Sequence, residues 1–424
     1  MLIFSTLVLL TAFQDPVIPA EISEPSLLWT RKTVGENIVS IELVSRRYEA
    51  EGKPDLWLIG VAHVAEESFY DEVTSLLDEM ELVLYESVRP SGSRPPSGTT
   101  EEERVASTQK SLEFVADVAK RCSEESDLIP ETLEDVIADA SLIDRRLPNF
   151  VEDASVDAWR RPFVLQVNHA KNEIILWSFG SDGAIGGTGS ASDLTARRTV
   201  KILDDGDERV EEGDIDKGIQ AEFADVLGLE FQLEALSYEE PNWFCSDLTI
   251  DEVESKLEVR GADASVLGTI TGESFTAKIA SSFMKIIPML DSFTDGGARE
   301  TAKLLMIEML SLPESEEMLY RVEPELAQVI IVDRNTEVLN DIAATIKVVE
   351  DLSSIGVLYG AGHMADLSLR LNSLFGYKSV EDRWFTAMRA NPNDSLLDEK
   401  YMRKMRAMLR LQLHNAKKKK QETK

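Results

Sequence analysis

The pattern of hydrophobic and polar positions predicts a strand, a helix and a second strand over residues 56–86. Leu56–Ile59 is a short apolar run, apolar residues then recur at helical spacing, and a second apolar run follows at Leu82–Tyr85. Two strands joined by a helix within about 30 residues form a βαβ unit with parallel strands. Ligands bind at the carboxyl ends of such strands, where His63 and Glu86 stand. We therefore expect His63 and Glu86 to be neighbours in space.

The same arrangement returns near the C-terminus. Ile355–Tyr359 is an apolar run, Gly360-Ala361-Gly362-His363 follows, and a helical pattern begins at Met364. Gly-x-x-His thus occurs twice, at 60–63 and 360–363, each time between a predicted strand and a predicted helix. The chain has only four histidines, and these two motifs contain half of them.

The remaining pattern predicts an α/β (α+β) fold with a mixed sheet that carries both strand-GxxH-helix units. A strand pattern within Leu28–Ser45 pairs as a hairpin with the strand at Leu56, and Phe231–Leu236 reads as a further strand. Pro324–Asp333 is either a strand or the start of a buried helix, and Asn335–Val349 continues as a helix with one apolar face.

An insertion is predicted to interrupt this domain. The Pro/Gly/Ser-rich stretch Arg89–Thr100 reads as a linker, and the acidic run Asp204–Asp216 reads as the return linker. Between them the pattern predicts a helix over Glu101–Cys122 and strands over Phe163–Asn168 and Glu173–Ser178. The predicted order is a first domain part at 28–90, an inserted domain at 101–200, and a second domain part at 215–390.

Charge changes the picture of the partners. With 77 acidic and 44 basic side chains the net charge is −33, so nucleic acids and anionic membrane surfaces are excluded as partners of the body of the protein because their phosphates would be repelled. The basic tail at 396–424 is the exception, since it reads either as a membrane-touching amphipathic helix or as a helix packed on the acidic body.

The N-terminus predicts export. Residues 2–13 form an apolar run that is too short to span a bilayer, and it resembles the core of a secretory signal with cleavage after Ala20. A short membrane anchor is the alternative. We expect a secreted or periplasmic protein, and we expect Cys122 and Cys245 to be unrelated free cysteines because they fall in different predicted domains.

Four short motifs resemble the TraB/PrgY/GumN/Tiki superfamily. They are GVAHV at 60–64, Tyr85-Glu86, VDRN at 332–335 and YGAGHM at 359–364, and the segment at 231–247 is similar to the bacterial TraB-like branch. Tiki proteins are regarded as divalent-metal proteases. The resemblance therefore implies a metal-dependent hydrolase. The superfamily also resembles erythromycin esterases, in which a histidine acts as a base without metal.

Two imidazoles and one carboxylate form a known catalytic metal set. We expect His63, His363 and Glu86 to act as ligands of a divalent transition metal (Mn, Co or Zn) or as general bases. Arg334 is expected to stabilise an oxyanion or to bind a substrate carboxylate, because its guanidinium is always charged. The resemblance adds three supporting residues, Asn335, Tyr238 and Asp247, and we expect His169 and His414 to be structural.

The insertion resembles the globular domain of the major pseudopilin of type II secretion. DAWRRPF at 157–163, SFGSDG at 178–183 and SDL at 192–194 carry the resemblance, although Arg160 replaces the glycine of the family motif. The hydrophobic assembly helix of pseudopilins is absent, so the insertion looks like a borrowed module. The resemblance implies a calcium ion held by Asp182, Asp193, Ser190, Phe179 and Ala184, which suits the preference of calcium for six to eight oxygen ligands.

Two functions follow as hypotheses. The first is a secreted or periplasmic metal-dependent hydrolase of the peptidase class, whose inserted module positions the protein or binds a secretion or surface assembly. The second is a non-enzymatic binding protein that captures a peptide or small ligand and docks through the insertion. Metal content and peptide cleavage distinguish the two.

Overall fold

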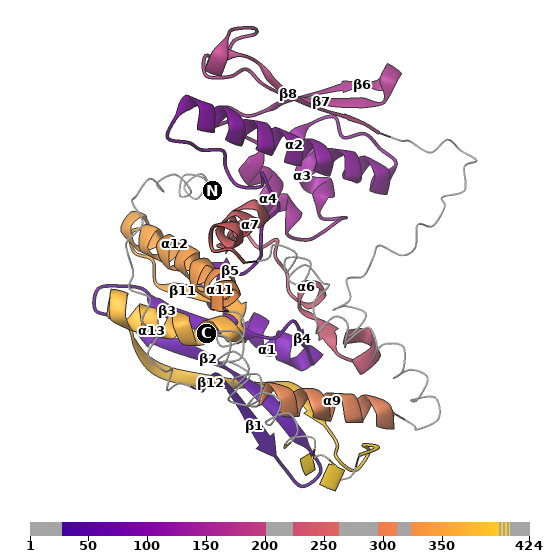
Figure 1. Cartoon of the computed structure of the whole chain (residues 1–424), viewed down its shortest axis with the longest axis vertical. Coiled ribbons are helices and arrows are strands. Elements are labelled where there is room, and N and C mark those ends of the chain that lie inside the picture. The colour runs from indigo at the N-terminus through magenta and orange to yellow at the C-terminus, as the bar shows by residue number, and fades with distance from the viewer. Residues whose placement is uncertain are drawn as a thin grey trace, which may run out of the picture. The chain divides into compact units, whose positions relative to one another are not determined.

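The computed structural model describes residues 28–200, 224–262, 296–311 and 324–397, with five further residues between 400 and 407. These residues form two compact units (Figure 1). Unit 1 contains residues 87–200 and 237–252, and unit 2 contains the other described residues. The predicted signal at 1–20, the acidic run at 204–216 and most of the basic tail lie outside the described residues. Within the described part of the chain, no helix combines the length and the apolarity needed to cross a membrane.

Unit 1 is built around one long helix with a sheet on one side and two short helices on the other (Figure 1). The helix α2 packs against the antiparallel sheet β6-β7-β8 and against α3 and α4. The elements of unit 1 are α2 (Glu101–Ser126), α3 (Leu133–Ala140), α4 (Leu147–Ala154), β6 (Val164–Asn168), β7 (Glu173–Ser178), β8 (Leu194–Thr199) and β10 (Trp243–Cys245).

Local sequence explains where the helices of unit 1 begin. Thr100 accepts a hydrogen bond from the Glu103 backbone N–H, and the Glu103 side chain accepts one from the Thr100 N–H, which together form a capping box for α2. Thr132 and Asp135 form the same device for α3. Such reciprocal bonds satisfy backbone donors that have no partner inside the helix.

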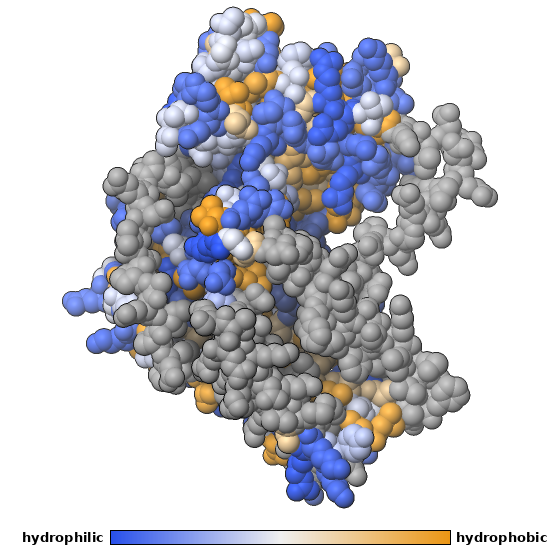
Figure 2. Space-filling model, viewed as in Figure 1, coloured by the Kyte–Doolittle hydropathy of each residue, from blue (hydrophilic) through white to orange (hydrophobic). Residues whose placement is uncertain are grey.

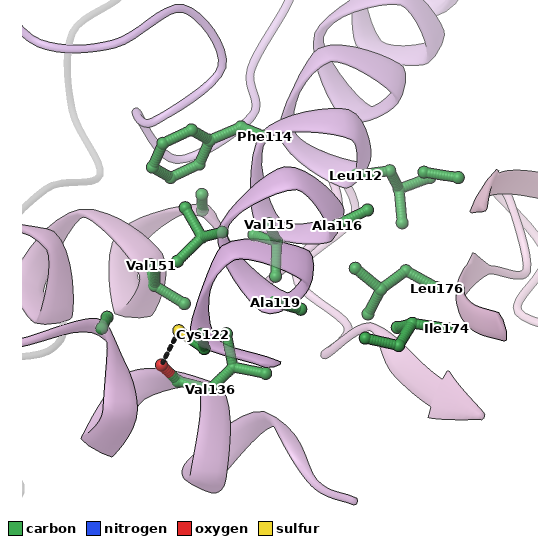
Figure 3. Packing of buried hydrophobic residues seen from close by; sticks show 14 of the residues in the cluster. Leu112, Phe114, Val115, Ala116, Ala119, Cys122, Val136, Val151, Ile174 and Leu176 are labelled. Carbon is green, nitrogen blue, oxygen red and sulfur yellow. Dashed lines mark hydrogen bonds between the residues drawn. The ribbon is translucent and has the colours of Figure 1, made fainter. Parts of the chain in front are cut away.

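The core of unit 1 lies between α2 and its neighbours (Figure 3). Leu112, Val115 and Ala119 of α2 contribute to it, and Leu176 of β7 is fully buried there. Cys122 lies in the same core with its thiol toward the Val136 carbonyl. Burial raises the pKa of the Cys122 thiol to about 12, so it packs as a neutral apolar group. Cys122 and Cys245 are both free, as expected, but the stated reason was wrong, because both lie in unit 1.

Unit 2 contains a mixed sheet whose strands are β1 (Thr30–Val34), β2 (Val39–Glu49), β3 (Asp55–Val61), β5 (Leu82–Tyr85), β11 (Ser354–Gly360) and β12 (Lys378–Ala390). The strand order is β1-β2-β3-β11-β5, and β12 also pairs with β2. β3, β11 and β5 are parallel, while β1, β2 and β12 are antiparallel to their partners. This arrangement confirms the predicted α/β class with a mixed sheet. β11 lies between β3 and β5. The two strands of the predicted βαβ unit are therefore separated by the strand that carries the second Gly-x-x-His motif.

The other elements of unit 2 surround this sheet. They are β4 (Val64–Ala65), α1 (Glu67–Leu77), β9 (Glu230–Phe231), α6 (Gln232–Ala235), α9 (Gly297–Leu310), α11 (Pro324–Ala327), α12 (Arg334–Val348) and α13 (Met364–Phe375). A π-helical turn, Gln328–Asp333, joins α11 to α12, and α7 (Ile250–Val259) runs across the boundary between the units.

Helices cover both faces of the parallel strands. Gly60 of β3 lies against Met364 of α13, whereas Gly356 of β11 lies against Leu77 and Met80 at the end of α1. The two glycines point to opposite faces, because Gly356 is in register with Trp57 and not with Gly60. A methyl group at Gly356 would approach Met80 to 3.0 Å, so the missing side chain permits the close packing of α1.

One sequence prediction is wrong in the structure, and one open alternative is resolved. Phe231–Leu236 is not a strand, because only Glu230–Phe231 pairs, with β4, and Gln232–Ala235 forms a single helical turn. A six-residue apolar pattern does not distinguish these states. The alternative at Pro324–Asp333 resolves as helix.

The stretch Arg89–Thr100 belongs to unit 1 and is bonded to it. The buried Arg89 guanidinium pairs with Asp153 at 2.6 Å and lies over the Phe150 ring.

On the face shown in Figure 2, hydrophilic residues predominate over the described surface and hydrophobic residues form scattered patches. Scattered exposed apolar side chains are normal on protein surfaces.

Candidate functional site

The candidate site of unit 2 lies at the carboxyl ends of its parallel strands. Glu86 directly follows β5, Gly360 ends β11, and His63 stands two residues after β3. His363 closes the short 3-10 turn between β11 and α13. Because β11 is the central strand of the three, its Gly-x-x-His turn is the one placed next to Glu86.

Three neighbours hold the Glu86 carboxylate. Arg334 Nη2 donates to Oε1 at 2.7 Å, the Gly360 backbone N–H donates to Oε2 at 2.6 Å, and His363 Nε2 lies 3.4 Å from Oε1. The side chains of Glu86, Arg334 and His363 are 12%, 6% and 6% exposed. The three side chains therefore form a buried cluster of charge and imidazole.

The pKa of Glu86 lies well below its ordinary value. Burial alone would raise this pKa, but the positive charges of His363 and Arg334, the hydrogen bond from His363 and the charge of His63 outweigh it. A carboxylate with such a low pKa is a poor proton acceptor at neutral pH. Of the two roles predicted for Glu86, the electrostatics favour a fixed negative charge or a ligand over a general base.

Asn335 determines which nitrogen of His363 faces Glu86. Its amide Nδ2 donates to the His363 carbonyl at 3.1 Å and to Asp366 Oδ2 at 2.8 Å, so its Oδ1 faces His363 Nδ1 at 2.8 Å. An amide oxygen only accepts, and Nδ1 therefore carries a proton. His363 Nε2 is left to face the carboxylate. Asn335 is fully buried, and its supporting role in a functional site stays a prediction.

His63 lies in a different environment. It is exposed, and its Nδ1 lies 3.1 Å from Gln232 Oε1, while the Gln232 N–H donates to the His63 carbonyl at 2.9 Å. Gln232 is a site residue that sequence reasoning did not find. It stands inside the motif-bearing segment at 231–247, but nothing in the local pattern indicates a partner 169 positions earlier.

His63, His363 and Glu86 offer the types of ligand atom that divalent transition metals bind. An amide oxygen holds the Nδ1 of both histidines, which is the arrangement that leaves Nε2 for a metal, and Glu86 adds a carboxylate oxygen. The donors thus fit in type and tautomer. In the described residues, however, no three His, Cys, Asp or Glu side chains are grouped closely enough to hold an ion. Arg334 also occupies the Glu86 oxygen that faces His363.

The loop between β7 and β8 in unit 1 contains the predicted calcium ligands. Asp182 Oδ1 accepts the Ala184 N–H at 3.0 Å, the Phe179 carbonyl accepts the Gly183 N–H at 3.1 Å, and the Ser190 carbonyl accepts the Ser181 N–H at 2.8 Å.

Asp193 in this loop has one carboxylate oxygen that accepts a hydrogen bond and one that does not. Its Oδ2 accepts the Gly186 N–H at 3.0 Å, whereas Oδ1 is buried and has no hydrogen-bond partner among the described residues. A buried acceptor without a donor is unfavourable unless a cation or water supplies the missing contact. The loop therefore fits a calcium ion.

The motif at 157–163 braces this loop. Buried Asp157 accepts the N–H groups of Trp159 and Arg161, both at 2.9 Å, and the Ser178 hydroxyl at 2.9 Å. Arg161 in turn donates to the carbonyls of Gly180 at 2.5 Å and Ser181 at 2.8 Å. Two of the three motifs that suggested a pseudopilin, those at 157–163 and 178–183, are thus bonded to each other.

The two remaining predicted site residues lie in unit 1. Tyr238 is buried, its carbonyl accepts from Asn149, and its ring meets Trp243 edge to face. Asp247 is buried, and its Oδ1 accepts the Leu248 N–H at 2.7 Å. These contacts describe structural roles within unit 1, while the residues around Glu86 belong to unit 2.

Comparison with protein families identifies one segment of the chain. Residues 129–197 match the family described as type II secretion system protein G, which confirms the predicted pseudopilin-like module. The match begins after α2 and ends within β8, so α3, α4 and the sheet carry it. It ties this part of unit 1 to a secretion-associated family.

No curated protein and no solved structure is similar enough to the chain to count as a match. The resemblance of unit 2 to the TraB/PrgY/GumN/Tiki superfamily stays a prediction that rests on its motifs.

Proposed function

We propose that unit 2 is a hydrolase of peptide bonds with His363 as its proton-transferring group. The observation that carries the proposal is the buried cluster of Glu86, Arg334 and His363 at the carboxyl ends of parallel strands. Ligands bind at this edge of α/β sheets. A buried imidazole held by a carboxylate and an amide is also a common device for acid–base catalysis.

Each residue of the cluster has one task in this proposal. His363 Nε2 accepts a proton from the attacking water and returns it to the leaving amine, so that water adds across the broken C–N bond. Glu86 stabilises the protonated ring, and Arg334 keeps Glu86 ionised. The predicted binding of an oxyanion by Arg334 stays part of the proposal, because its guanidinium is always charged.

A divalent transition metal would be held by His363 Nε2, Glu86 and His63, and it would supply Lewis-acid activation of a carbonyl or of water. Nε2 would then be a ligand, so the proton-transferring role of His363 belongs to the metal-free form. Metal and proton compete for the same lone pair of Nε2, so binding is expected to weaken as pH falls. Mn, Co and Zn all accept imidazole and carboxylate ligands.

Elemental analysis and peptide-library cleavage test this function together. We expect the wild-type protein to contain one transition metal per chain and to cleave peptides, and we expect His63→Ala/His363→Ala to lose both. His169→Ala is the matched control, because His169 is an exposed histidine of unit 1 that pairs with Glu131. If the wild type cleaves peptides but the double variant has the same metal content as the wild type, the two histidines do not bind the metal, and the function is that of a metal-free hydrolase.

Peptide binding without cleavage would instead support a non-enzymatic binding protein and overturn the proposal. That alternative has one structural argument in its favour. Both oxygens of Glu86 are engaged inside the protein, as in a rigid recognition surface.

We infer that unit 1 acts as a docking module that holds calcium and binds a secretion or surface assembly outside the cytoplasm. The match to the secretion protein and the unpartnered Asp193 oxygen support this proposal.

Calcium is expected to raise the melting temperature of the wild-type protein but not that of Asp193→Asn. Asp117→Asn on α2 serves as a control in which the calcium effect is kept. Equal melting temperatures of the wild type in calcium and in chelator would contradict the calcium site.

A further inference from the structure

Behind His363, on the side away from Glu86, polar side chains form a buried chain of contacts. Asn335 contacts Asp366, and Asp366 contacts Arg370, which stands four residues later on α13. The side chains of Asp366 and Arg370 are 11% and 7% exposed. Neither residue belongs to a motif that the sequence singled out.

The orientation of the Asn335 amide depends on Asp366. The amide has a donor end and an acceptor end, and either end would fit a neutral imidazole, which presents one donor or one acceptor at Nδ1 according to its tautomer. Asp366 Oδ2 accepts only, so it binds the donor end at 2.8 Å and turns Oδ1 toward His363. Without that carboxylate, only the His363 carbonyl would still select the orientation.

Arg370 holds Asp366 and at the same time anchors α13 to the helix that carries Asn335. Its Nη1 donates to Asp366 Oδ2 at 3.2 Å and to the Val332 carbonyl at 3.0 Å, and its Nη2 donates to Thr336 Oγ1 at 2.8 Å. Val332 lies in the π-helical turn. Such turns change the helical register and are frequent at functional sites, so Arg370 fixes the segment from which Arg334 and Asn335 project.

We propose that Asp366, held by Arg370, is a positioning residue that sets the tautomer of His363 through Asn335. Its carboxylate keeps the proton on Nδ1 and leaves Nε2 directed at Glu86. The inference rests on the proposed function only for its catalytic consequence, since the tautomer itself is measured without a substrate.

Nitrogen-15 NMR of histidine-labelled protein tests the inference. The chain has four histidines, so replacing each in turn by Gln assigns the ring signals. The wild type is expected to show an Nδ1–H signal for His363, because Nδ1 faces the accepting oxygen of Asn335 at 2.8 Å. Asp366→Ala should weaken that signal, because only the 3.1 Å bond to the His363 carbonyl then orients the Asn335 amide and the other tautomer becomes populated.

Two further variants separate positioning from general destabilisation. Asp366→Asn keeps an accepting oxygen at the same place, and it is expected to retain the Nδ1–H signal. Asp382→Ala removes a different carboxylate of unit 2, one that pairs with buried Arg46 and does not touch Asn335, and it should leave the His363 signals unchanged. Arg370→Met provides a second variant if Asp366→Ala does not fold, with partial loss expected.

An unchanged Nδ1–H signal in Asp366→Ala, or a wild-type His363 protonated at Nε2 alone, would overturn the inference. Activity separates it from the proposed function. If peptides are cleaved, Asp366→Ala should lower kcat at least tenfold with little change in KM. If no peptide is cleaved but the NMR pattern follows Asp366, the hydrolase proposal fails and the positioning role stands.

Discussion

At the scale of single residues, Glu86 shows how a buried charge is kept. Its carboxylate is removed from water, which is costly for an isolated ion, yet Arg334, His363 and the Gly360 N–H surround it. Removing one member of such a group leaves an uncompensated charge, and this is why its residues act as a unit. Glu86 and Arg334, which come from two different motifs, therefore form one buried ion pair.

Arg160 stands where the pseudopilin motif has glycine, and the structure shows why the family residue is glycine. Its φ is +71°, a left-handed conformation that glycine adopts without strain and a side chain disfavours by roughly 1 kcal/mol. The N–H groups of Trp159 and Arg161 donate to Asp157 and hold the turn. Arg160, which lies between them, therefore keeps the left-handed conformation.

Arg160→Gly is expected to raise the free energy of unfolding of unit 1 by about 0.5–1 kcal/mol, because the strain of the left-handed turn is removed. Chemical denaturation followed by hydrogen exchange in β6 and β7 measures the change. Arg121→Gly within α2 is the matched control, and it should lower stability by about 1 kcal/mol. A destabilised Arg160→Gly would show that the arginine side chain contributes more than the turn costs.

At the scale of elements, the two units use different means to place their polar residues. In unit 1, capping boxes at Thr100 and Thr132 start the helices at positions that the sequence itself marks. In unit 2, the π-helical turn at 328–333 precedes Arg334 and Asn335 and lets two consecutive residues reach Glu86 and His363. The first device is local, whereas the second depends on contacts with α13.

The connection between α3 and α4 is closed by Asp144 and Arg146. The Arg146 guanidinium donates to both oxygens of Asp144, and its backbone N–H donates to Oδ1 at 2.8 Å. Burial alone would raise the pKa of Asp144, but the hydrogen bond and the charge of Arg146 lower it by more, so this pKa lies below its ordinary value of 3.8. A carboxyl with a lowered pKa stabilises the fold above that ordinary value, and this contribution is lost as pH falls through the folded pKa.

Asp144→Asn is accordingly expected to lower the free energy of unfolding by about 1 kcal/mol at neutral pH, with a difference from wild type that shrinks as pH falls below about 4. Thermal denaturation of both proteins across this range measures it. Glu152→Gln on α4, an exposed carboxylate, should match wild type throughout. A difference that stays constant with pH would contradict the electrostatic explanation.

At the scale of the whole molecule, the chain combines two compact units that are interleaved in sequence. Residues 87–200 and 237–252 form unit 1, while the segments before, between and after them contribute to unit 2. The unit boundary falls at Ser87, earlier than the predicted linker suggested, and the segment from Ser237 to Glu252 joins unit 1. Two of the predicted site residues, Tyr238 and Asp247, therefore belong to unit 1 and not to the unit that contains Glu86.

Separate cores predict separate unfolding. Leu176→Ala removes a fully buried side chain from the core of unit 1 and is expected to lower its stability by about 3 kcal/mol. Hydrogen exchange followed by mass spectrometry should show faster exchange in α2 and β7 and unchanged exchange in β11. Leu128→Ala, at a side chain that is 70% exposed, should have little effect. Equal loss of protection in both units would show that they unfold as one.

The sequence by itself determined the features that depend on neighbouring residues. Apolar spacing predicted β3, α1, β5, β11, α2 and α12, and the motifs located Glu86, His363, Arg334 and Asn335 and identified the pseudopilin-like module. Such signals are local, because a helix face, a capping box or a Gly-x-x-His turn is written within a few positions.

Only the tertiary structure decided which of these residues meet. It placed β11 between β3 and β5, so His363 and not the exposed His63 lies beside Glu86. It brought Gln232 to His63 across 169 positions and Arg334 to Glu86 across 248. It also recruited Asp366 and Arg370, which no motif marks. Pairings at such separations arise from strand order and helix packing, and these depend on the whole chain folding at once.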